Sequence, residues 1–161
     1  MSGKLRSMTS VYLMKDDRFL LLFREGGRVV NHVYTGSAGG HFEKDELNDA
    51  RACVLREMQE ELGLTAEDIG EMAFRYVTLR DTNGEIRQNY YFFAELLCGR
   101  ELVSNEGTLC WVTGEEALRL PMPVTAKAVF AHYLHTGRFD KKRYVGITGS
   151  DDTVFLELPE T

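Results

Sequence analysis

The sequence predicts an α/β protein in which one mixed β-sheet is flanked by helices. Short apolar segments bounded by turn residues indicate strands near both ends and in the middle of the chain. Two segments with apolar residues at helical spacing lie between these strands. The resulting order is strands, helix, strands, helix, strands. It lacks the regular alternation of strand and helix that is typical of a doubly wound parallel sheet.

The first predicted elements are a hairpin and a loop. Residues 11–14 and 19–23 are apolar and are separated by polar residues, which is the pattern of two strands joined by a turn. Residues 24–41 are rich in glycine and have few periodic apolar positions. We expect a surface loop there that includes Gly39 and Gly40. Loops of this kind often carry function.

A helix is predicted from about residue 48 to residue 62. Its apolar residues recur every four positions and therefore share one face, which consists of Ala50, Val54, Met58 and Leu62. Asn48 or Asp49 can cap the first turn, and Gly63 can end the helix.

The rest of the chain is predicted to contain a long hairpin, two helices and a closing hairpin. Thr65 and Asp68 have the spacing of a capped turn. Asn83-Gly84 is the strongest hairpin signal in the sequence. The expected elements are strands over 72–79, 86–97 and 109–112, helices over 113–118 and 124–135, the second stopped by Gly137, and a hairpin over 144–148 and 153–158.

Length and charge restrict the possible functions. With 161 residues the chain is long enough for one core, and we expect residues 1–161 to form one domain. The net charge is -6, and lysine and arginine form no long run, so duplex nucleic acid is not an expected partner. A small anionic substrate remains compatible with this charge, because a bound divalent cation can reverse the local field of an acidic site.

Cysteine content and hydropathy favour a cytoplasmic location. Cys53, Cys98 and Cys110 are odd in number and have no paired spacing, so neither a disulfide framework nor a zinc site is indicated. Residues 1–10 lack an apolar signal core, and no segment approaches the roughly 18 consecutive apolar residues of a membrane span. No membrane partner is therefore expected. The sequence leaves both a monomer and a homodimer open.

Three glutamates on the predicted helix form the most informative chemical pattern. Glu57, Glu60 and Glu61 stand at positions i, i+3 and i+4 and therefore share one face. Carboxylates this close raise one another's pKa unless a positive charge lies between them. Their hard oxygen atoms suit Mg²⁺ or Mn²⁺. Taken alone, however, such a cluster is more often a solvated helix face.

Together with its surroundings, this cluster resembles the motif of the Nudix hydrolase family. That motif runs glycine, five residues, glutamate, seven residues, Arg-Glu, a bulky aliphatic residue, any residue, Glu-Glu, any residue, glycine and an aliphatic residue. Gly40 and Glu46 resemble its first half, and residues 56–64, Arg-Glu-Met-Gln-Glu-Glu-Leu-Gly-Leu, resemble its second half. Nine residues rather than seven separate Glu46 from Arg56. Either two residues are inserted before the helix, or Glu46 is not the equivalent of the family's first glutamate.

The resemblance implies a fold, a metal and a set of site residues. The fold is the family's α-β-α sandwich with a mixed sheet, and the metal is Mg²⁺, with Mn²⁺ as the alternative. The implied ligands are Glu57, Glu60, Glu61, Glu106 and the carbonyl of Gly39. Arg56 is implied to orient Glu57. Glu106 resembles a downstream glutamate that binds metal or activates water, although an ordinary exposed loop residue is the alternative, and Glu43 is a weaker candidate.

The implied reaction is attack of a metal-activated water on phosphorus, with Glu60, Glu61 or Glu106 as the proton acceptor. The layout of the chain after Pro123 resembles Nudix enzymes that remove oxidised purine nucleoside triphosphates. It implies cleavage of a nucleoside triphosphate, with 8-oxo-dGTP as a candidate, to the monophosphate and pyrophosphate. Against this, Val124-Thr125 stands where the human member of that group has an acidic pair.

Two other functions remain open at this stage. One is hydrolysis of a different nucleoside diphosphate derivative, such as ADP-ribose, a nucleotide sugar, a dinucleotide or a capped RNA end. The other is a non-catalytic nucleotide-binding regulator, which the complete set of carboxylates disfavours. Residues that could contact the substrate, and that could equally be ordinary surface residues, are Arg24, Arg28, Asn31, Tyr34 and Arg87, with Arg80 and one ring of the segment 90–93 as further candidates.

Overall fold

The structure is a computed structural model that describes residues 3–25, 32–150 and 152–159. Its strands are β1 (Lys4–Lys15), β2 (Arg18–Arg24), β3 (Val33–Thr35), β4 (Ala38–His41), β5 (Ala73–Thr82), β6 (Glu85–Glu95), β7 (Thr108–Thr113), β8 (Arg143–Thr148) and β9 (Thr153–Leu158). Its α-helices are α1 (Ala50–Leu62), α2 (Gly114–Leu118) and α3 (Val124–His135), and its short 3₁₀ turns are η1 (Lys44–Glu46), η2 (Ala66–Asp68) and η3 (Gly137–Phe139).

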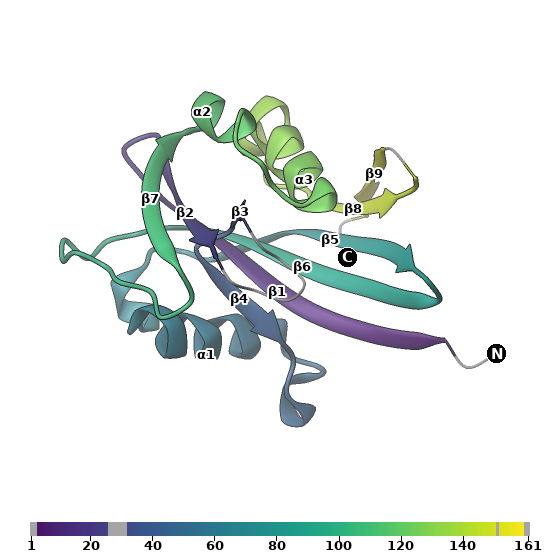
Figure 1. The fold of residues 1–161 in the computed structure, drawn as a ribbon, viewed down its shortest axis with the longest axis horizontal. Coiled ribbons are helices and arrows are strands. Elements are labelled where there is room, and N and C mark those ends of the chain that lie inside the picture. The colour runs from purple at the N-terminus through teal and green to yellow at the C-terminus, as the bar shows by residue number, and fades with distance from the viewer. Residues whose placement is uncertain (1–2, 26–31, 151, 160–161) are drawn as a thin grey trace.

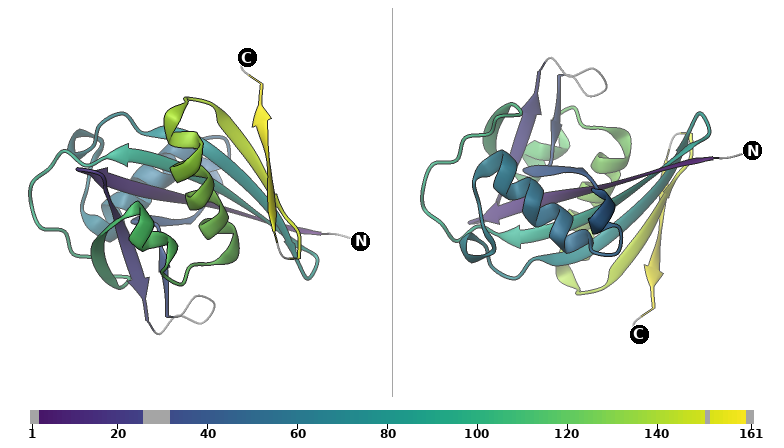
Figure 2. Two further views of the ribbon diagram at one scale, coloured as in Figure 1. Left: turned by 90° about the horizontal axis from the view of Figure 1, so that it is seen from above. Right: turned by 90° about the horizontal axis from the view of Figure 1, so that it is seen from below.

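In the described part of the chain the strands form one mixed sheet. The strand order is β3-β2-β1-β6-β5-β8-β9, with β4 added to β1 and β7 added to β2. β1 runs parallel to β6 and β5 runs parallel to β8, whereas the other pairs are antiparallel. α1 covers one side of this sheet and α3 the other (Figures 1 and 2). The predicted α/β class, a mixed sheet between helices, is therefore confirmed.

Two buried clusters fill the spaces between the sheet and its helices. The cluster under α1 contains Val11 and Leu13 of β1, whereas the cluster under α3 contains Tyr12. This division follows from the alternation of side chains along a strand. β1 therefore contributes to both cores, and its position determines where both helices lie. No helix in the described ranges is long and apolar enough to cross a membrane.

The predicted helix over residues 48–62 is confirmed as α1. Its N-cap is Asp49, whose carboxylate accepts a hydrogen bond from the Ala52 N–H at 3.0 Å, so Asn48 is not the cap. Val54 and Met58 on the predicted apolar face are completely buried. Gly63 ends the helix in the left-handed conformation, with φ of 69°.

The Asn83-Gly84 turn is also confirmed. Both residues have positive φ, 54° and 83°, which is the pattern of a type I′ hairpin turn. The turn joins β5 to β6, and the two strands pair from Thr82 and Glu85 up to Ala73 and Phe93. This hairpin forms the middle of the sheet and projects beyond the helices at one end (Figure 1).

The prediction of a continuous loop over residues 24–41 was wrong, because β3 and β4 lie within it. β4 pairs with β1, and Gly39 lies opposite Ser10. A Cβ atom at Gly39 would lie 2.1 Å from the Thr9 carbonyl oxygen, so the strand requires glycine there. Glycine weakens the sequence pattern of a strand, and for that reason the close backbone contact was not apparent.

The start of β1 and the role of one glycine differ from the prediction. β1 begins at Lys4 rather than at residue 11, because its first half is polar and its partner is the equally polar start of β6. α3 ends at His135, as predicted, but Gly137 is the first residue of η3. A Cβ atom at Gly137 would lie 2.3 Å from the Tyr76 hydroxyl oxygen. Gly137 therefore serves close packing against β5 rather than the end of the helix.

A buried serine joins the segment between β3 and β4 to the sheet. The Ser37 hydroxyl donates a hydrogen bond to the Leu20 carbonyl at 2.6 Å and accepts one from the Leu13 N–H at 2.9 Å. Its own N–H donates to the Val11 carbonyl at 2.8 Å. Since Ser37 is fully buried, no water can replace its hydroxyl.

We predict that Ser37→Ala lowers the free energy of unfolding by about 2 kcal/mol, because two buried backbone groups lose their hydrogen-bond partner. Urea denaturation measures the change. The matched control is Ser150→Ala, which removes an exposed hydroxyl and should change stability by less than about 0.5 kcal/mol. A loss at Ser37 as small as that of the control would contradict the assignment.

Candidate active site

Arg56 is the centre of a network that joins α1 to the chain before it. Its guanidinium donates two hydrogen bonds to the Glu46 carboxylate, at 2.7 and 2.9 Å, and one to the His41 carbonyl at 3.0 Å. It also donates to Glu57 at 3.0 Å and to Glu60 at 3.1 Å. The predicted contact between Arg56 and Glu57 is therefore present, but Glu46 is the partner that Arg56 contacts with two parallel hydrogen bonds.

Glu46 is the residue whose role the sequence left open. Its side chain is 9% exposed, and its carboxylate also accepts a hydrogen bond from the Glu43 N–H at 2.9 Å. Hydrogen bonds from Arg56 hold the pKa of Glu46 below its usual value, against the opposing effect of burial. The two additional residues between Glu46 and Arg56 are accommodated in residues 47–49, which form a turn between η1 and α1. Glu46 thus reaches Arg56 despite the two additional residues.

Glu57 and Glu61 lie against the two glycines of β4. The Gly39 N–H donates a hydrogen bond to the Glu61 carboxylate at 3.1 Å. A Cβ atom at Gly40 would lie 2.5 Å from an oxygen of Glu57, so only glycine leaves room for that carboxylate. Burial raises the pKa of Glu57 and raises that of Glu61 to about 7. Both carboxylates are therefore held in an environment that disfavours their charge.

Both side chains line a cleft of about 580 Å³ that runs across the sheet and under the start of α3. Of the residues predicted to form the site, Gly39, Glu106, Arg24 and Arg87 also line it. Arg24 lies 3.7 Å from Glu106, and the negative charge of Glu106 acts on Glu61. The structure therefore brings together residues of β2, β4, α1 and the loop before β7 that lie far apart in the sequence.

Glu60 lies apart from this group. Its side chain is 56% exposed, bonds to Arg56 and does not line the cleft. In residues 3–25, 32–150 and 152–159, no three His, Cys, Asp or Glu side chains converge in an arrangement ready to hold a metal ion. The helical spacing thus places Glu57 and Glu61 at the cleft, whereas Glu60 lies outside the cleft and bonds to Arg56.

The remaining predicted substrate residues have mixed outcomes. Tyr34 packs against Phe23, with ring centroids 4.8 Å apart, and does not line the cleft. Arg28 and Asn31 lie outside the described residues. In the aromatic segment 90–93, only Tyr91 reaches the cleft.

Sequence reasoning did not predict several residues of the cleft wall, namely Arg6, Ser10, Thr78, Asn89 and Thr125. Arg6 and Ser10 belong to the polar half of β1, which no apolar pattern indicates. Arg87, Asn89 and Tyr91 alternate along β6, so a period of two was the signal that could have placed Asn89 beside Arg87.

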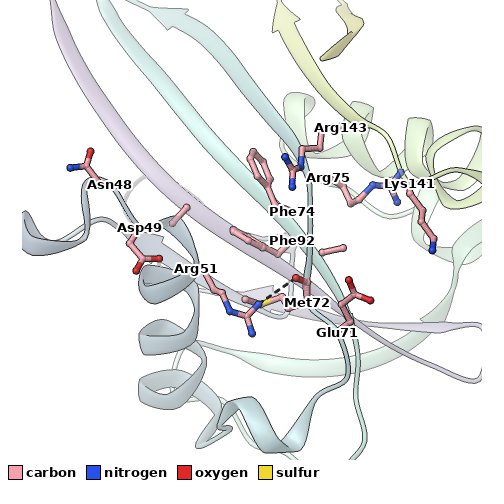
Figure 3. A pocket seen from close by; sticks show the side chains of 12 residues that line it. Asn48, Asp49, Arg51, Glu71, Met72, Phe74, Arg75, Phe92, Lys141 and Arg143 are labelled. Carbon is pink, nitrogen blue, oxygen red and sulfur yellow. Dashed lines mark hydrogen bonds between the residues drawn. The ribbon is translucent and has the colours of Figure 1, made fainter. Parts of the chain in front are cut away.

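A second hollow of about 540 Å³ lies on the side of the sheet that α1 covers (Figure 3). Phe74 and Phe92 form its centre, and Arg51, Lys141 and Arg143 lie around it (Figure 3). Its Asp49 carboxylate caps α1 and its Arg51 guanidinium donates to the Met72 carbonyl. It contains none of the motif glutamates, so the cleft beside Glu57 and Glu61 is the stronger candidate for the active site.

We predict that Glu46→Gln lowers the free energy of unfolding by about 1–3 kcal/mol at pH 7, because Arg56 loses its charged, largely buried partner. The pKa of Glu46 is lowered by folding, so its contribution is complete above the pKa of the unfolded state and disappears as pH falls through the folded value. The difference between the two proteins in urea denaturation should therefore shrink below about pH 4. An equal difference at both pH values would contradict the assigned ion pair.

Comparison with known proteins agrees with this geometry. The family model described as NUDIX domain matches residues 4–133. The chain is similar to the solved structure of the mutator MutT protein from Bacillus halodurans, with a TM-score of 0.66 and 24% identity over 97% of this chain and 99% of that chain. A search of the curated proteins found no match.

Two further solved structures show the same fold. One is the dihydroneopterin triphosphate pyrophosphohydrolase of E. coli, with a TM-score of 0.64 and 16% identity over 81% of this chain and 94% of that chain. The other is an Ap4A hydrolase of C. elegans, with a TM-score of 0.61 and 18% identity over 85% of this chain and 99% of that chain. At these identities the structures show the fold, whereas the family model spans most of the chain. The chain therefore belongs to the NUDIX domain family and is a Nudix hydrolase.

Proposed function

We propose that this hydrolase depends on Mg²⁺ and cleaves a nucleoside triphosphate to the monophosphate and pyrophosphate, with 8-oxo-dGTP as the first candidate substrate. The observation that carries the proposal is the pair of carboxylates, Glu57 and Glu61, that α1 holds against the glycines of β4 at the wall of the cleft. Two carboxylates in a partly buried position are costly unless a cation or a proton is present.

A divalent cation fits this wall because it would compensate the negative charge of both carboxylates at once. Burial raises the pKa of both carboxylates, and a nearby cation would reverse that effect. The donor set consists of oxygen atoms, which suits Mg²⁺ and also Mn²⁺. We assign Glu57 and Glu61 as ligands, with Glu60, Glu106 and the Gly39 carbonyl as the additional ligands that the family motif implies.

The other residues of the site have separate tasks in this proposal. Bound Mg²⁺ supplies charge for the phosphate oxygens and lowers the pKa of a coordinated water. Arg56 keeps Glu57 in place from outside the cleft and is a positioning residue. Arg24 lies in the cleft wall, where its guanidinium can bind a phosphate. Glu106 is 46% exposed beside Arg24 and is our first candidate for the base, with Glu60 and Glu61 as alternatives.

The names of the similar proteins support a nucleotide-like substrate with linked phosphates. They do not favour one particular substrate. The similar proteins are a MutT protein, a dihydroneopterin triphosphate pyrophosphohydrolase and an Ap4A hydrolase by name. Two of these names include a triphosphate or a polyphosphate-linked dinucleotide, so both kinds of substrate belong in the test. ADP-ribose, nucleotide sugars and capped RNA ends are the further alternatives. We also propose a cytoplasmic location, since Cys53, Cys98 and Cys110 are free thiols.

We predict that Glu57→Gln keeps the fold and lowers kcat by roughly 100-fold or more, because the amide is a weaker metal ligand and carries no charge. Calorimetric titration of Mg²⁺ or Mn²⁺ into the protein should show binding that the substitution weakens. Glu115→Gln is the matched control, because Glu115 is exposed on α2 outside the cleft. Metal binding and turnover equal to those of the control would remove Glu57 from the site.

We predict a separate outcome for Glu60→Gln. The substitution should leave thermal stability nearly unchanged, since the side chain is 56% exposed. The kcat should fall by roughly 100-fold or more, because the proposal makes Glu60 a metal ligand or the proton acceptor. Steady-state kinetics with saturating Mg²⁺ measure the change in kcat. Near-normal kcat would remove Glu60 from the site and leave it only as a partner of Arg56.

A further inference from the structure

Three arginines lie side by side on the sheet at the wall of the cleft. Arg6 of β1 is in register with Arg87 of β6, and Arg87 is in register with Arg80 of β5. All three line the cleft. Adjacent strands are only about 4.8 Å apart, so the three side chains start from neighbouring positions on one face. We refer to Arg6, Arg87 and Arg80 as the arginine row.

Little negative charge compensates the arginine row. Glu85 lies 3.8 Å from Arg6 and 3.1 Å from Arg87. The Arg80 side chain forms no ion pair or hydrogen bond with any residue in the ranges that the structure describes. The adjacent Asp81 accepts a hydrogen bond from the Gly84 N–H in the hairpin turn, and strand alternation directs it to the opposite face. Like charges on opposed strand positions are destabilising, and Glu85 offsets only part of this repulsion, so a bound anion would stabilise the row.

Hydrogen-bond donors extend the row at the Arg80 end. Thr148 of β8 is in register with Arg80, and its hydroxyl lies 2.9 Å from the Thr125 hydroxyl. Thr125 belongs to the first turn of α3 and also lines the cleft. The hydroxyl of Thr125 and the positive end of the α3 backbone dipole therefore border the space next to Arg80.

The arginine row is separate from the carboxylate end of the cleft. Glu57 and Glu61 lie against Gly40 and Gly39, which pair with Thr9 and Ser10 of β1. Arg6 precedes these residues by three and four positions. At about 3.3 Å per residue this places the Arg6 backbone roughly 10–13 Å along the strand. The cleft therefore has an acidic end that suits a metal and a cationic end that suits an anion.

We propose that the arginine row binds a second phosphate, a phosphomonoester on the nucleoside half of a nucleotide, so that the cleft takes nucleotides with this group as well as the simple triphosphates proposed above. A guanidinium group can bind two phosphate oxygens at once, and three such groups on neighbouring strands are suited to a dianion. Because the Arg6 backbone lies roughly 10–13 Å along β1 from the residues that pair with Gly39 and Gly40, we place the second phosphate on the far side of the ribose from the metal. This inference rests on the proposed function in one respect, because it takes the cleft as the nucleotide site.

The test compares ligands that the enzyme does not cleave. Titration calorimetry measures the affinity for AMP and for adenosine 3′,5′-bisphosphate, and then for the corresponding two guanosine ligands. In each series the ratio of the two affinities gives the effect of the added phosphate. Wild-type protein should bind the bisphosphate about tenfold more tightly or better in at least one series. Because no bond is broken, failure of the proposed hydrolase activity does not affect this result.

Substitutions assign the preference to the row. In Arg80→Gln and Arg87→Gln the bisphosphate preference should fall roughly tenfold while monophosphate binding changes little. Arg119→Gln, which removes an exposed arginine outside the cleft, should retain the wild-type ratio. The preference should also shrink between about 50 and 500 mM NaCl. Equal affinity for the two ligands, no binding of either, or a preference that survives both substitutions would overturn the proposal.

Discussion

The contact between Arg56 and Glu46 supports most of the candidate site. Its two hydrogen bonds, at 2.7 and 2.9 Å, join the chain before α1 to the middle of that helix. The same guanidinium reaches Glu57, Glu60 and the His41 carbonyl, so one cation orients the helix, its carboxylates and the end of β4 together. Without this cation the partly buried carboxylates would repel one another with no compensation. The positions of Glu57 and Glu61 at the cleft therefore depend on an ion pair whose members do not touch the cleft.

Glycine provides the second constraint. β4 approaches β1 so closely that a Cβ at Gly39 would overlap the Thr9 carbonyl, and a Cβ at Gly40 would occupy the space of the Glu57 carboxylate. Ser37 joins the preceding residues to β1 and β2 through a buried hydroxyl. A rigid backbone thus faces the helix, and the carboxylates have a fixed wall to lie against. Across the sheet, the polar half of β1 continues the cleft toward the arginine row, which gives the two ends of the cleft opposite charge.

The sequence predicted the local features of this arrangement and missed those that depend on contacts between distant segments. Helix α1, its Asp49 and Gly63 caps and the shared face of Glu57 and Glu61 follow from spacing within one helix, and the structure has them. β4 was missed because its strand character comes from backbone contacts of glycines with β1. The role of Glu46 could not be read from a motif with altered spacing, because it depends on where Arg56 reaches in space. Arg80 lies opposite Arg87 because the two-residue Asn83-Gly84 turn fixes the register of the hairpin, so local sequence could have paired them. Arg6 becomes a neighbour of Arg87 only through the parallel pairing of β1 with β6, which no local pattern specifies.

The most direct test of the central claim is hydrolysis of a substrate panel with and without Mg²⁺. The panel contains ordinary and oxidised nucleoside triphosphates, dihydroneopterin triphosphate, ADP-ribose and Ap4A, and ³¹P NMR identifies the products. Our account predicts that one nucleoside triphosphate is cleaved preferentially to its monophosphate and pyrophosphate, and that removal of Mg²⁺ with EDTA abolishes the reaction. Cleavage that continues at the same rate in EDTA, or no cleavage of any member of the panel in Mg²⁺, would contradict it.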